Sequence, residues 1–554
     1  MQNCISCNVS FEDSQAEISL RAKIGDAIQK GDLPEPKLCC DCRLIQLMSW
    51  RNERILYTRM CDKSGKKIIS VYPQNVAFPV YEKSIWWGDS WNATNYGQDY
   101  DFNRPFFEQF AELQRNTPRA SLNTKNVENC DYCNFTFDSK DSYLTTCCYY
   151  SESILYSFWM LECKDCTECS YCFQCQNCLQ CTDCNKSYGC YECVQCNVCT
   201  DSSYLFDCRG CTDCFCSVGL RNAKYHMFNE KLSKEEFENR MKEFDLQNPV
   251  HVEKVKERLD ALKLKHPHKY SVQEKCEDST GDHIVELKDC KNCYQTFRSR
   301  DCINVTDADG NNDLLDCYHT GWSEMIYEGY SPVRLRNSAF EVQCWDGNDI
   351  FYSDTCQNCS YCFGCISLRQ NKYCILNKQY SKEEYEVMLY KIINHMKSTG
   401  EWGKFFPNEI CIFSYNDSVA QDVYPLEKEE AIKRGWKWQD NLPFTMGKET
   451  TTWNSYEMKI EKVQEDILNE IFACECCKKN YRIIRSELKF YKQMKLPLSR
   501  LCSGCRHLER IKTRNPRNLH NRTCNKCNKE IQTTFAPERP EKVYCEECYL
   551  KEVY

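Results

Sequence analysis

The stretch "CKDCTECSYCFQCQNCLQCTDC", residues Cys163 to Cys184, places a cysteine at every third position eight times in succession. A helix drifts by about 60° for every three residues, and a strand puts residues i and i+3 on opposite faces. A period of three therefore fits neither a plain helix nor a plain strand. It indicates a fold in which the chain turns at a short, fixed interval.

The same register extends far beyond this stretch. Residues 130–216 contain 20 cysteines, of which 18 share one phase modulo three and two, Cys147 and Cys216, do not. Residues 290–365 contain nine more, all in one phase. Reading every third residue from Ser139 gives Ser, Ser, Thr, Cys, Ser, Ile, Ser and Met. Small or apolar side chains thus fill the in-phase positions, and cysteine is one of several that do.

A narrow β-solenoid accounts for this register. Hexapeptide-type β-solenoids turn every few residues, so their inward positions recur at a fixed spacing and accept only compact side chains. Residues 127–216 divide into 15 hexapeptides, and residues 284–367 supply some 14 more. Residues 208–238 align with residues 356–386 at a constant offset of 148, and "SKEE" after each lobe predicts a helix with a capping box. The sequence predicts a mainly β chain with helical insertions and two duplicated, period-three solenoid lobes.

The in-phase cysteines have three interpretations. Packing is favoured, because cysteine is a small, soft hydrophobe. Successive coils lie about 4.8 Å apart, so thiolates of neighbouring coils could also hold zinc or an iron–sulfur cluster. A cluster is not expected, because no Cys-Pro closes such a motif and the continuous spacing leaves no distinct set of four ligands. Native disulfides are the third interpretation.

The two ends of the chain carry paired C-x-x-C knuckles. Structural zinc takes four soft ligands in a tetrahedron, and each knuckle supplies two of them. Residues 38–68 align without a gap to residues 501–531 at a constant offset of 463, so the ends are copies. One site of the N-terminal copy is lost, because Ser64 replaces the knuckle partner of Cys61. We predict about three zinc ions, bound by Cys4, Cys7, Cys39 and Cys42; by Cys474, Cys477, Cys502 and Cys505; and by Cys524, Cys527, Cys545 and Cys548.

Residues 474–506 resemble the probable zinc-ribbon family, whose pattern is C-x-x-C, E-x-x-F-Y, a proline and C-x-x-C-R. The matching residues are Glu487, Phe490, Tyr491, Pro497 and Arg506. The whole arrangement, with "RNERILY", "FFEQF", the triplet middle and the zinc-ribbon tail, resembles a group of uncharacterised cysteine-rich zinc-ribbon proteins of small-celled bacteria. The resemblance implies zinc binding and implies no activity.

Composition indicates a soluble, cytoplasmic protein. Of its 554 residues 42% are hydrophobic and 27% charged, no window approaches 18 consecutive apolar residues, and the start lacks the regions of a signal peptide. We expect no membrane contact, and a reducing compartment in which the 47 cysteines are metal ligands or buried thiols. We find no catalytic motif and no ligand-spaced histidines, so we expect no enzyme and identify no small-molecule substrate.

Residues 478–522 form a strongly basic segment. It holds 14 Lys and Arg against two Glu, whereas the whole chain has a net charge of −8. Cations around a rigid zinc scaffold suit phosphate backbones, and Tyr481, Phe490 and Tyr491 lie among them where bases could stack. The alternative is a solvated face, with these rings inside the ribbon core. The candidate nucleic-acid contacts are Arg482, Arg485, Arg506, Arg510, Lys512, Arg514, Arg517 and Arg522.

These features lead to one functional hypothesis and two alternatives. We expect a non-enzymatic, zinc-stabilised binding scaffold whose basic end contacts RNA, the ribosome or DNA, and whose solenoid docks proteins. The alternatives are a metal-storage or redox protein that uses the triplet cysteines, and a structural self-assembling protein. The expected domains are a zinc module (1–72), an aromatic-rich connector (73–126), solenoid lobe 1 (127–230), a helical segment (231–283), solenoid lobe 2 (284–380), a second helical segment (381–450), a basic zinc ribbon (451–523) and a second zinc ribbon (524–554).

Overall fold

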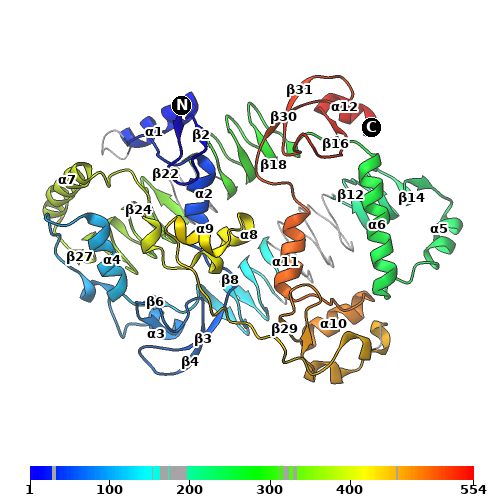
Figure 1. The fold of residues 1–554 in the computed structure, drawn as a ribbon, viewed down its shortest axis with the longest axis horizontal. Helices are drawn as coiled ribbons and strands as arrows, with labels where there is room; N and C mark the ends of the chain where they lie inside the picture. The colour runs from blue at the N-terminus through cyan, green and yellow to red at the C-terminus, as the bar shows by residue number, and fades with distance from the viewer. Residues whose placement is uncertain are drawn as a thin grey trace. The chain divides into compact units, whose positions relative to one another are not determined.

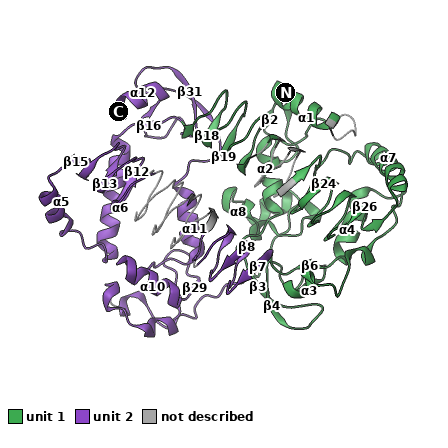
Figure 2. Cartoon of the chain, turned by 180° about the vertical axis from the view of Figure 1, so that it is seen from behind, with its two compact units in different colours: residues 1–122, 271–442 green, residues 123–270, 443–554 purple. Residues whose placement is uncertain are grey.

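The structure is a computed structural model that describes residues 1–27, 33–152, 154–161, 172–173, 196, 198–310, 312–315, 324–327, 333–456 and 459–554. Of the run from Cys163 to Cys184, only residues 172 and 173 lie within the described part. The chain forms two compact units (Figure 2): unit 1 is Met1–Leu122 with Ser271–Leu442, and unit 2 is Asn123–Tyr270 with Pro443–Tyr554. Each unit therefore contains one solenoid lobe and zinc modules from one end of the chain, lobe 2 in unit 1 and lobe 1 in unit 2.

Parallel strands of the two lobes form the predicted β-solenoid. In unit 2 they are β7 (Thr124–Glu128), β8 (Asn134–Lys140), β9 (Thr146–Tyr149), β10 (Phe158–Leu161), β11 (Cys172–Phe173), β12 (Ser203–Phe206), β13 (Thr212–Val218) and β14 (Lys224–Met227), followed by antiparallel β15 (Glu230–Lys231). In unit 1 they are β17 (Gln273–Glu274), β18 (Gly281–Val285), β19 (Cys293–Phe297), β20 (Thr306–Asp309), β21 (Asn312–Leu315), β22 (Glu324–Tyr327), β23 (Val333–Arg336), β24 (Trp345–Phe351), β25 (Ser360–Phe363) and β26 (Lys372–Ile375), followed by antiparallel β27 (Lys378–Gln379).

The strand register gives the length of one coil. Asn348 pairs with Ser360, which pairs with Lys372, so each step of the register spans four triplets. The same step joins Thr212 to Lys224 in lobe 1. One coil is therefore four triplets, or two hexapeptides.

Corner residues mark every triplet. Along the described coils the backbone enters the left-handed region at every third position, as at Asn126 (φ 51°), Asn129 (φ 48°) and Tyr132 (φ 57°). Non-glycine residues rarely adopt this conformation, and Asn and Asp do so most readily. Because a coil contains four triplets and each triplet has one corner, each coil has four corners.

The residue after each corner occupies an inward position. Cys356, Cys359, Cys362 and Cys365 follow corners in this way and are fully buried. The inward ladder is thus confirmed for the described cysteines. The two cysteines of lobe 1 that break the phase, Cys147 and Cys216, have φ of 59° and 45° and occupy corners themselves.

The start of lobe 2 contains a change of register. Gln273 pairs with Ile284, so this coil is one residue shorter than the usual four triplets. Gly281 pairs with Cys293, which restores the usual coil length of four triplets. Gly281 has φ 142° and lies so close to the next coil that a Cβ there would meet the carbonyl oxygen of Cys293 at 1.8 Å. The short coil shifts the phase by one position, which explains why Cys276 is out of register with the cysteines that follow.

Helices contact strands of both lobes, and the helix predicted after each lobe is present. Ser233 and Glu236, and likewise Ser381 and Glu384, form capping boxes. The α-helices are α1 (Gln15–Ala27), α2 (Cys40–Ser49), α3 (Lys83–Trp87), α4 (Phe106–Asn116), α5 (Lys234–Met241), α6 (Pro249–Lys265), α7 (Lys382–Thr399), α8 (Val419–Val423), α9 (Lys428–Lys433), α10 (Arg485–Met494), α11 (Ser503–Lys512) and α12 (Glu546–Val553). Short 3₁₀ helices are η1 (Ala93–Tyr96), η2 (Asn408–Ile410), η3 (Tyr415–Asp417), η4 (Trp453–Ser455), η5 (Ile460–Lys462) and η6 (Glu465–Asn469).

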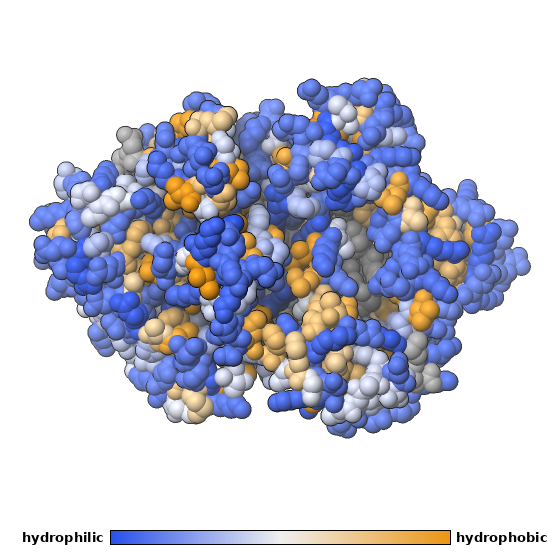
Figure 3. All heavy atoms as spheres, in the orientation of Figure 1, coloured by the Kyte–Doolittle hydropathy of each residue, from blue (hydrophilic) through white to orange (hydrophobic). Residues whose placement is uncertain are grey.

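Apolar cores lie between these coverings and the coils. In unit 2, α6 packs against β12 and β13 (Figure 1). In unit 1, Trp86, Phe106 and Phe110 of the aromatic-rich connector are buried, so the connector serves core packing. The face of the molecule in Figure 3 carries mostly hydrophilic side chains with scattered apolar ones. Among the described residues, no helix is both long and apolar enough to span a membrane.

Candidate metal centres

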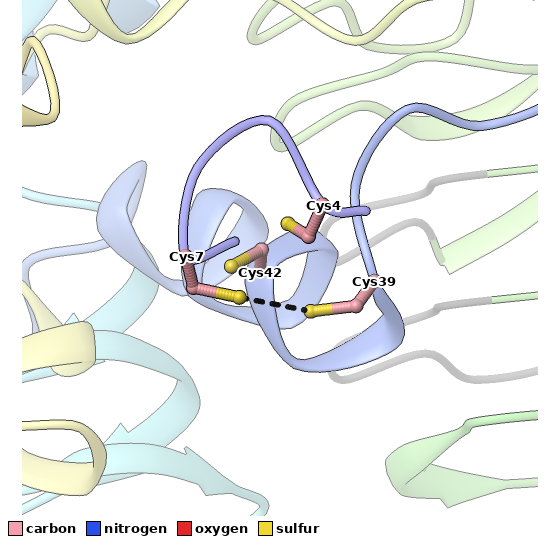
Figure 4. Close-up of side chains that lie close together, drawn as sticks. All are labelled: Cys4, Cys7, Cys39 and Cys42. Atoms are coloured by element: carbon pink, nitrogen blue, oxygen red, sulfur yellow. Dashed lines mark hydrogen bonds between the residues drawn. The ribbon is translucent and has the colours of Figure 1, made fainter. Parts of the chain in front are cut away.

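The N-terminal module brings its four predicted ligands together (Figure 4). The hairpin of β1 (Gln2–Asn3) and β2 (Ser10–Phe11) presents Cys4 and Cys7, and the first turn of α2 presents Cys39 and Cys42. Their four sulfur atoms lie within 4.8 Å of one another, and Cys7 Sγ is 3.6 Å from Cys39 Sγ. A knuckle and a helix N-terminus thus converge on one point.

The two C-terminal modules repeat this construction. The hairpins are β28 (Phe472–Ala473) with β29 (Asn480–Tyr481), and β30 (His520–Thr523) with β31 (Glu530–Thr533); α11 and α12 supply the second cysteine pairs. Sγ–Sγ distances are 3.6 Å for Cys477 to Cys502 and 3.7 Å for Cys527 to Cys545. A tetrahedron with zinc–sulfur bonds of about 2.3 Å has sulfur atoms about 3.8 Å apart. The three groups fit three zinc ions.

Local backbone geometry favours thiolates in these groups. Cys39, Cys502 and Cys545 are the N-cap residues of α2, α11 and α12, where the helix dipole and free N–H groups stabilise negative charge. The backbone N–H of Cys502 donates to Cys474 Sγ at 3.3 Å. Burial disfavours the Cys474 thiolate, but N–H donors of Cys477 and Cys502 outweigh it and lower its pKa to about 7. Burial and the charges of Cys474 and Cys477 raise the pKa of Cys502 to about 11, so a bound metal ion would itself supply the deprotonation of that ligand.

A fourth module keeps this fold without its ligands. Its hairpin of β3 (Tyr57–Met60) and β4 (Lys67–Ser70) is related to β30 and β31 by the same constant offset of 463 in the sequence. Gly65 N–H donates to Cys61 O at 2.9 Å, as Asn528 N–H donates to Cys524 O at 2.9 Å. Glu82 caps α3 where Cys545 caps α12. Cys61 is buried, with Glu82 N–H 3.3 Å from its sulfur, and Ser64, Glu82 and Ile85 stand where the C-terminal copy has Cys527, Cys545 and Cys548.

The first ribbons of the two ends are also copies, and here the offset in residue number is 470. Glu17 and Glu487 occupy equivalent places on α1 and α10, and both are buried. Arg43 follows Cys42 and lies 3.3 Å from Glu17; Arg506 follows Cys505 and lies 3.2 Å from Glu487. The E and R of the zinc-ribbon pattern are thus a buried ion pair.

Each of these ion pairs contacts the lobe of its own unit. Tyr156 of lobe 1 donates its hydroxyl to Glu487 at 2.7 Å, and the Arg506 guanidinium lies over its ring at 4.5 Å. Asn304 of lobe 2 donates to Glu17 at 3.0 Å. Burial and the Glu487 carboxylate raise the pKa of Tyr156 well above 10, so its hydroxyl remains a donor. Tyr156 and Asn304 are both corner residues, and they are related by the offset of the duplicated lobes, 148.

The sequence contained a signal for these contacts that the prediction did not use. The alignment of the two ends stopped short of the first knuckles, so the equivalence of Glu17 with Glu487 was missed. An alignment of the residues before position 38 requires an offset of 470 in place of 463, and at that offset Glu17 aligns with Glu487. The contacts with the lobes were beyond reach, because a period-three repeat does not indicate which corner meets a ribbon.

The solenoid cysteines satisfy their thiols by hydrogen bonds. Cys365 Sγ donates to the carbonyl oxygens of Phe363 and Cys374, each at 3.4 Å. Ser353, one coil earlier, donates to Phe351 O at 2.9 Å and accepts from Cys365 N–H at 3.1 Å. Burial raises the pKa of Cys293 and Cys356 well above 9. Cysteine and serine are therefore interchangeable in these inward positions.

Metal-binding geometry is confined to the ends in the part of the chain that the structure describes. There, the groups of three or more His, Cys, Asp or Glu that could hold an ion are the three terminal cysteine sets. The solenoid cysteines whose side chains are described form no disulfide bonds. Packing is therefore the interpretation that the described coils support. The cysteines of residues 163–171 and 174–195 lie outside the described part.

The eight predicted nucleic-acid contacts lie in different environments. Arg482, Arg485 and Lys512 are exposed, and Arg485 pairs with Glu465 at 2.8 Å. Arg514, Arg517 and Arg522 are half-buried, whereas Arg506 and Arg510 are buried. Tyr491 is buried, and Tyr481 and Phe490 pack against the same core. The rings thus lie in the ribbon core, and the exposed cations are fewer than the sequence suggests.

Comparisons with known proteins concern one end of the chain. Residues 517–553 match a family model described as "Probable treble clef zinc finger". This range contains all four cysteines of the last module, Cys524, Cys527, Cys545 and Cys548. A search of curated proteins and a search of solved structures each returned no match. The comparison supports a zinc-finger module at the C-terminal end, the cysteine geometry supports similar modules at both ends, and neither carries an activity.

Proposed function

We propose that this protein is a non-enzymatic, zinc-stabilised scaffold whose basic C-terminal segment contacts nucleic acid. The observation that carries the scaffold is the repeated docking of a zinc module on a solenoid lobe through a buried Glu–Arg pair. Breaking a buried pair is costly, because it leaves an unpaired charge in the interior. In each unit this contact fixes the ribbon on its lobe. A fixed arrangement of binding modules is what a scaffold requires.

The nucleic-acid part of the proposal rests on charge. The basic segment contains 14 Lys and Arg against two Glu, on a chain whose net charge is −8. Its exposed side chains include Lys478, Arg482, Lys489, Lys495 and Lys512. Each cation that contacts a phosphate releases counterions, so binding of this kind weakens steeply with salt. The expected partners are RNA, including ribosomal RNA, or DNA.

The test is fluorescence anisotropy of labelled RNA and DNA oligonucleotides with the full chain over a range of KCl concentrations. The proposal predicts binding at about 50 mM salt whose logarithm of affinity falls linearly with the logarithm of salt concentration. A control measures the same oligonucleotides with protein treated with a chelator, which should lose both zinc and binding. Absence of binding at this low salt concentration would remove nucleic acid from the proposal.

A further inference from the structure

We infer that a phosphodiester backbone binds one face of the first C-terminal ribbon, formed by its knuckle and the solvent side of α10. We call it the α10 face, and its residues are Lys478, Arg482, Lys489, Lys492 and Lys495. The inference rests on the proposed nucleic-acid binding and gives it a place. It separates these five cations from the arginines that belong to the fold.

The α10 face is open to solvent and predominantly basic; the exposed Glu475 of the knuckle pairs with Arg500 at 3.1 Å, outside the five cations. Lys478, Lys489 and Lys495 are exposed on it, together with Arg482 and the partly exposed Lys492. The opposite side of α10 is buried through Glu487, Leu488, Tyr491 and Met494. Among the residues that the structure describes, no ion pair involves Arg482, Lys489, Lys492 or Lys495. The cations are therefore not held by carboxylates of the ribbon.

The N-terminal ribbon is a natural control for this face. It has the same elements at the offset of 470: the β1–β2 hairpin corresponds to β28–β29, and both α1 and α10 begin at equivalent positions. The residues equivalent to the five cations are Asn8, Glu12, Ser19, Ala22 and Gly25. The cysteines and the buried Glu–Arg pair are the same in both copies. The ribbon therefore folds without these cations, and their presence in one copy requires another reason.

Other arginines of the basic segment, unlike the five cations of the α10 face, have a counterpart in the N-terminal copy. Arg506, Arg514, Arg517 and Arg522 correspond to Arg43, Arg51, Arg54 and Arg59 of the N-terminal copy. In that copy Arg51 pairs with Glu53 at 2.5 Å, and Arg59 donates to Pro73 O at 2.8 Å. Arg522 likewise donates to Ala536 O at 3.2 Å, and Ala536 is the equivalent of Pro73. Arg506 and Arg522 therefore serve the fold, and five of the cations that lack a basic counterpart lie on the α10 face. Lys479, Arg485, Arg510 and Lys512 also lack a basic counterpart but are not part of this face.

The chemistry of this face suits the backbone and not the bases. Three of its cations, Arg482, Lys489 and Lys492, come from the end of a hairpin and from one side of a helix, where positions i and i+3 are neighbours. The aromatic rings of the ribbon pack in its core, so stacking does not contribute. Binding should therefore be independent of sequence and strongly dependent on salt. RNA and DNA offer the same phosphodiester chemistry, and the test separates them.

The test compares two triple variants of the full chain. The face variant carries Lys478→Asn, Arg482→Gln and Lys489→Ser, of which the first and third are the residues of the N-terminal copy. The control variant carries Lys526→Gln, Lys529→Gln and Lys542→Gln, which removes three exposed cations of the last C-terminal module, outside the basic segment. Zinc content of both variants checks that the ribbons are folded. Anisotropy is measured with a short single-stranded RNA, with DNA of the same sequence, and with poly-glutamate.

The inference predicts at least a tenfold loss of affinity for the face variant and less than threefold for the control, at equal zinc content. The salt slope of the face variant should fall by about 2, since each lost phosphate contact on a single strand removes about 0.7. Equal losses in the two variants, a larger loss in the control, or tight binding of poly-glutamate would overturn the inference while nucleic-acid binding stands. No binding by the wild-type chain at about 50 mM salt would instead overturn the proposed function itself.

Discussion

The ends and the middle of this chain use the same C-x-x-C spacing for different purposes. At the ends the left-handed residue follows the knuckle, as Asn8 (φ 60°) follows Cys7, and four sulfur atoms gather within 4.8 Å. In the middle a left-handed residue precedes each in-phase cysteine for which the structure describes both residues, as Asn358 precedes Cys359 and Tyr361 precedes Cys362. Neighbouring solenoid thiols still interact inside the coil, as Cys359 does with Cys356 and Cys362. Among the described residues, however, the groups of three or more sulfur atoms within 4.8 Å of one another are those of the terminal knuckles.

The largest expected difference between the two regions is the effect of replacing one cysteine. Cys524→Ser should reduce zinc from three ions per chain to two and make residues 517–553 sensitive to protease, because a structural zinc contributes on the order of 10 kcal/mol. Cys365→Ser should retain all three ions, because Ser353 fills the equivalent slot of the preceding coil. Elemental analysis and limited proteolysis measure both. Zinc loss from Cys365→Ser would show that a solenoid thiol binds metal.

The fourth module, which keeps only Cys61 of the four cysteines of its copy, allows the reverse change. Ser64→Cys, Glu82→Cys and Ile85→Cys would provide, with Cys61, the four ligands that Cys524, Cys527, Cys545 and Cys548 provide in its copy. The hairpin and the helix cap are already in place, since Glu82 N–H contacts Cys61 Sγ at 3.3 Å. We expect four zinc ions per chain in the triple variant. The single variant Ser64→Cys should remain at three; a triple variant at three would contradict the equivalence of the two modules.

The contact between ribbon and lobe should have the next largest effect. Glu487→Gln leaves Arg506 buried without its carboxylate, and breaking a buried pair costs about 3–5 kcal/mol. Tyr156→Phe removes one hydrogen bond to the same carboxylate and should cost about 1–2 kcal/mol. Urea unfolding followed by proteolytic mapping measures both. Equal effects of the two substitutions would mean that the ion pair does not hold the ribbon on the lobe.

The smallest expected effect is on the pH dependence of stability, and it concerns Glu341, an acidic residue at an inward position of lobe 2. Glu341 is fully buried in lobe 2, one coil before Ser353, and neither carboxylate oxygen has a hydrogen-bond partner in the structure. Burial raises its pKa well above 4.5, so the folded chain favours the protonated acid. Its contribution to stability is therefore greatest below about pH 4.5 and is lost as pH rises toward the folded pKa.

Glu341→Met keeps the volume and removes the buried acid, so it should stabilise the chain at pH 7 by about 1–3 kcal/mol. Glu341→Gln keeps the shape, leaves an amide unpaired and removes the titration. The difference between wild type and Glu341→Gln in urea unfolding should therefore grow from pH 5 to pH 8. A constant difference over this range would mean that Glu341 is ionised in the folded protein.

Sequence alone predicted the parts of this fold that repeat locally. The three-residue period indicated inward positions, and the knuckles and the constant offset of 463 indicated the zinc modules and the lost fourth site. It could not give the four-triplet coil, because six or more triplets per coil would leave the same period. It overestimated the basic surface, because the burial of Arg506 and Arg510 depends on tertiary contacts. One of these contacts joins Arg506 to Tyr156, which is far from it along the chain.

The most direct test of the central claim, that terminal cysteines hold metal and solenoid cysteines pack, is the metal content of the reduced, purified chain together with its absorbance spectrum. The account predicts three zinc ions per chain and no absorption in the visible range, since three cysteine groups among the described residues have the geometry for metal. More than three metal ions per chain, or the visible absorption of an iron–sulfur cluster, would show that the solenoid cysteines are themselves a metal site.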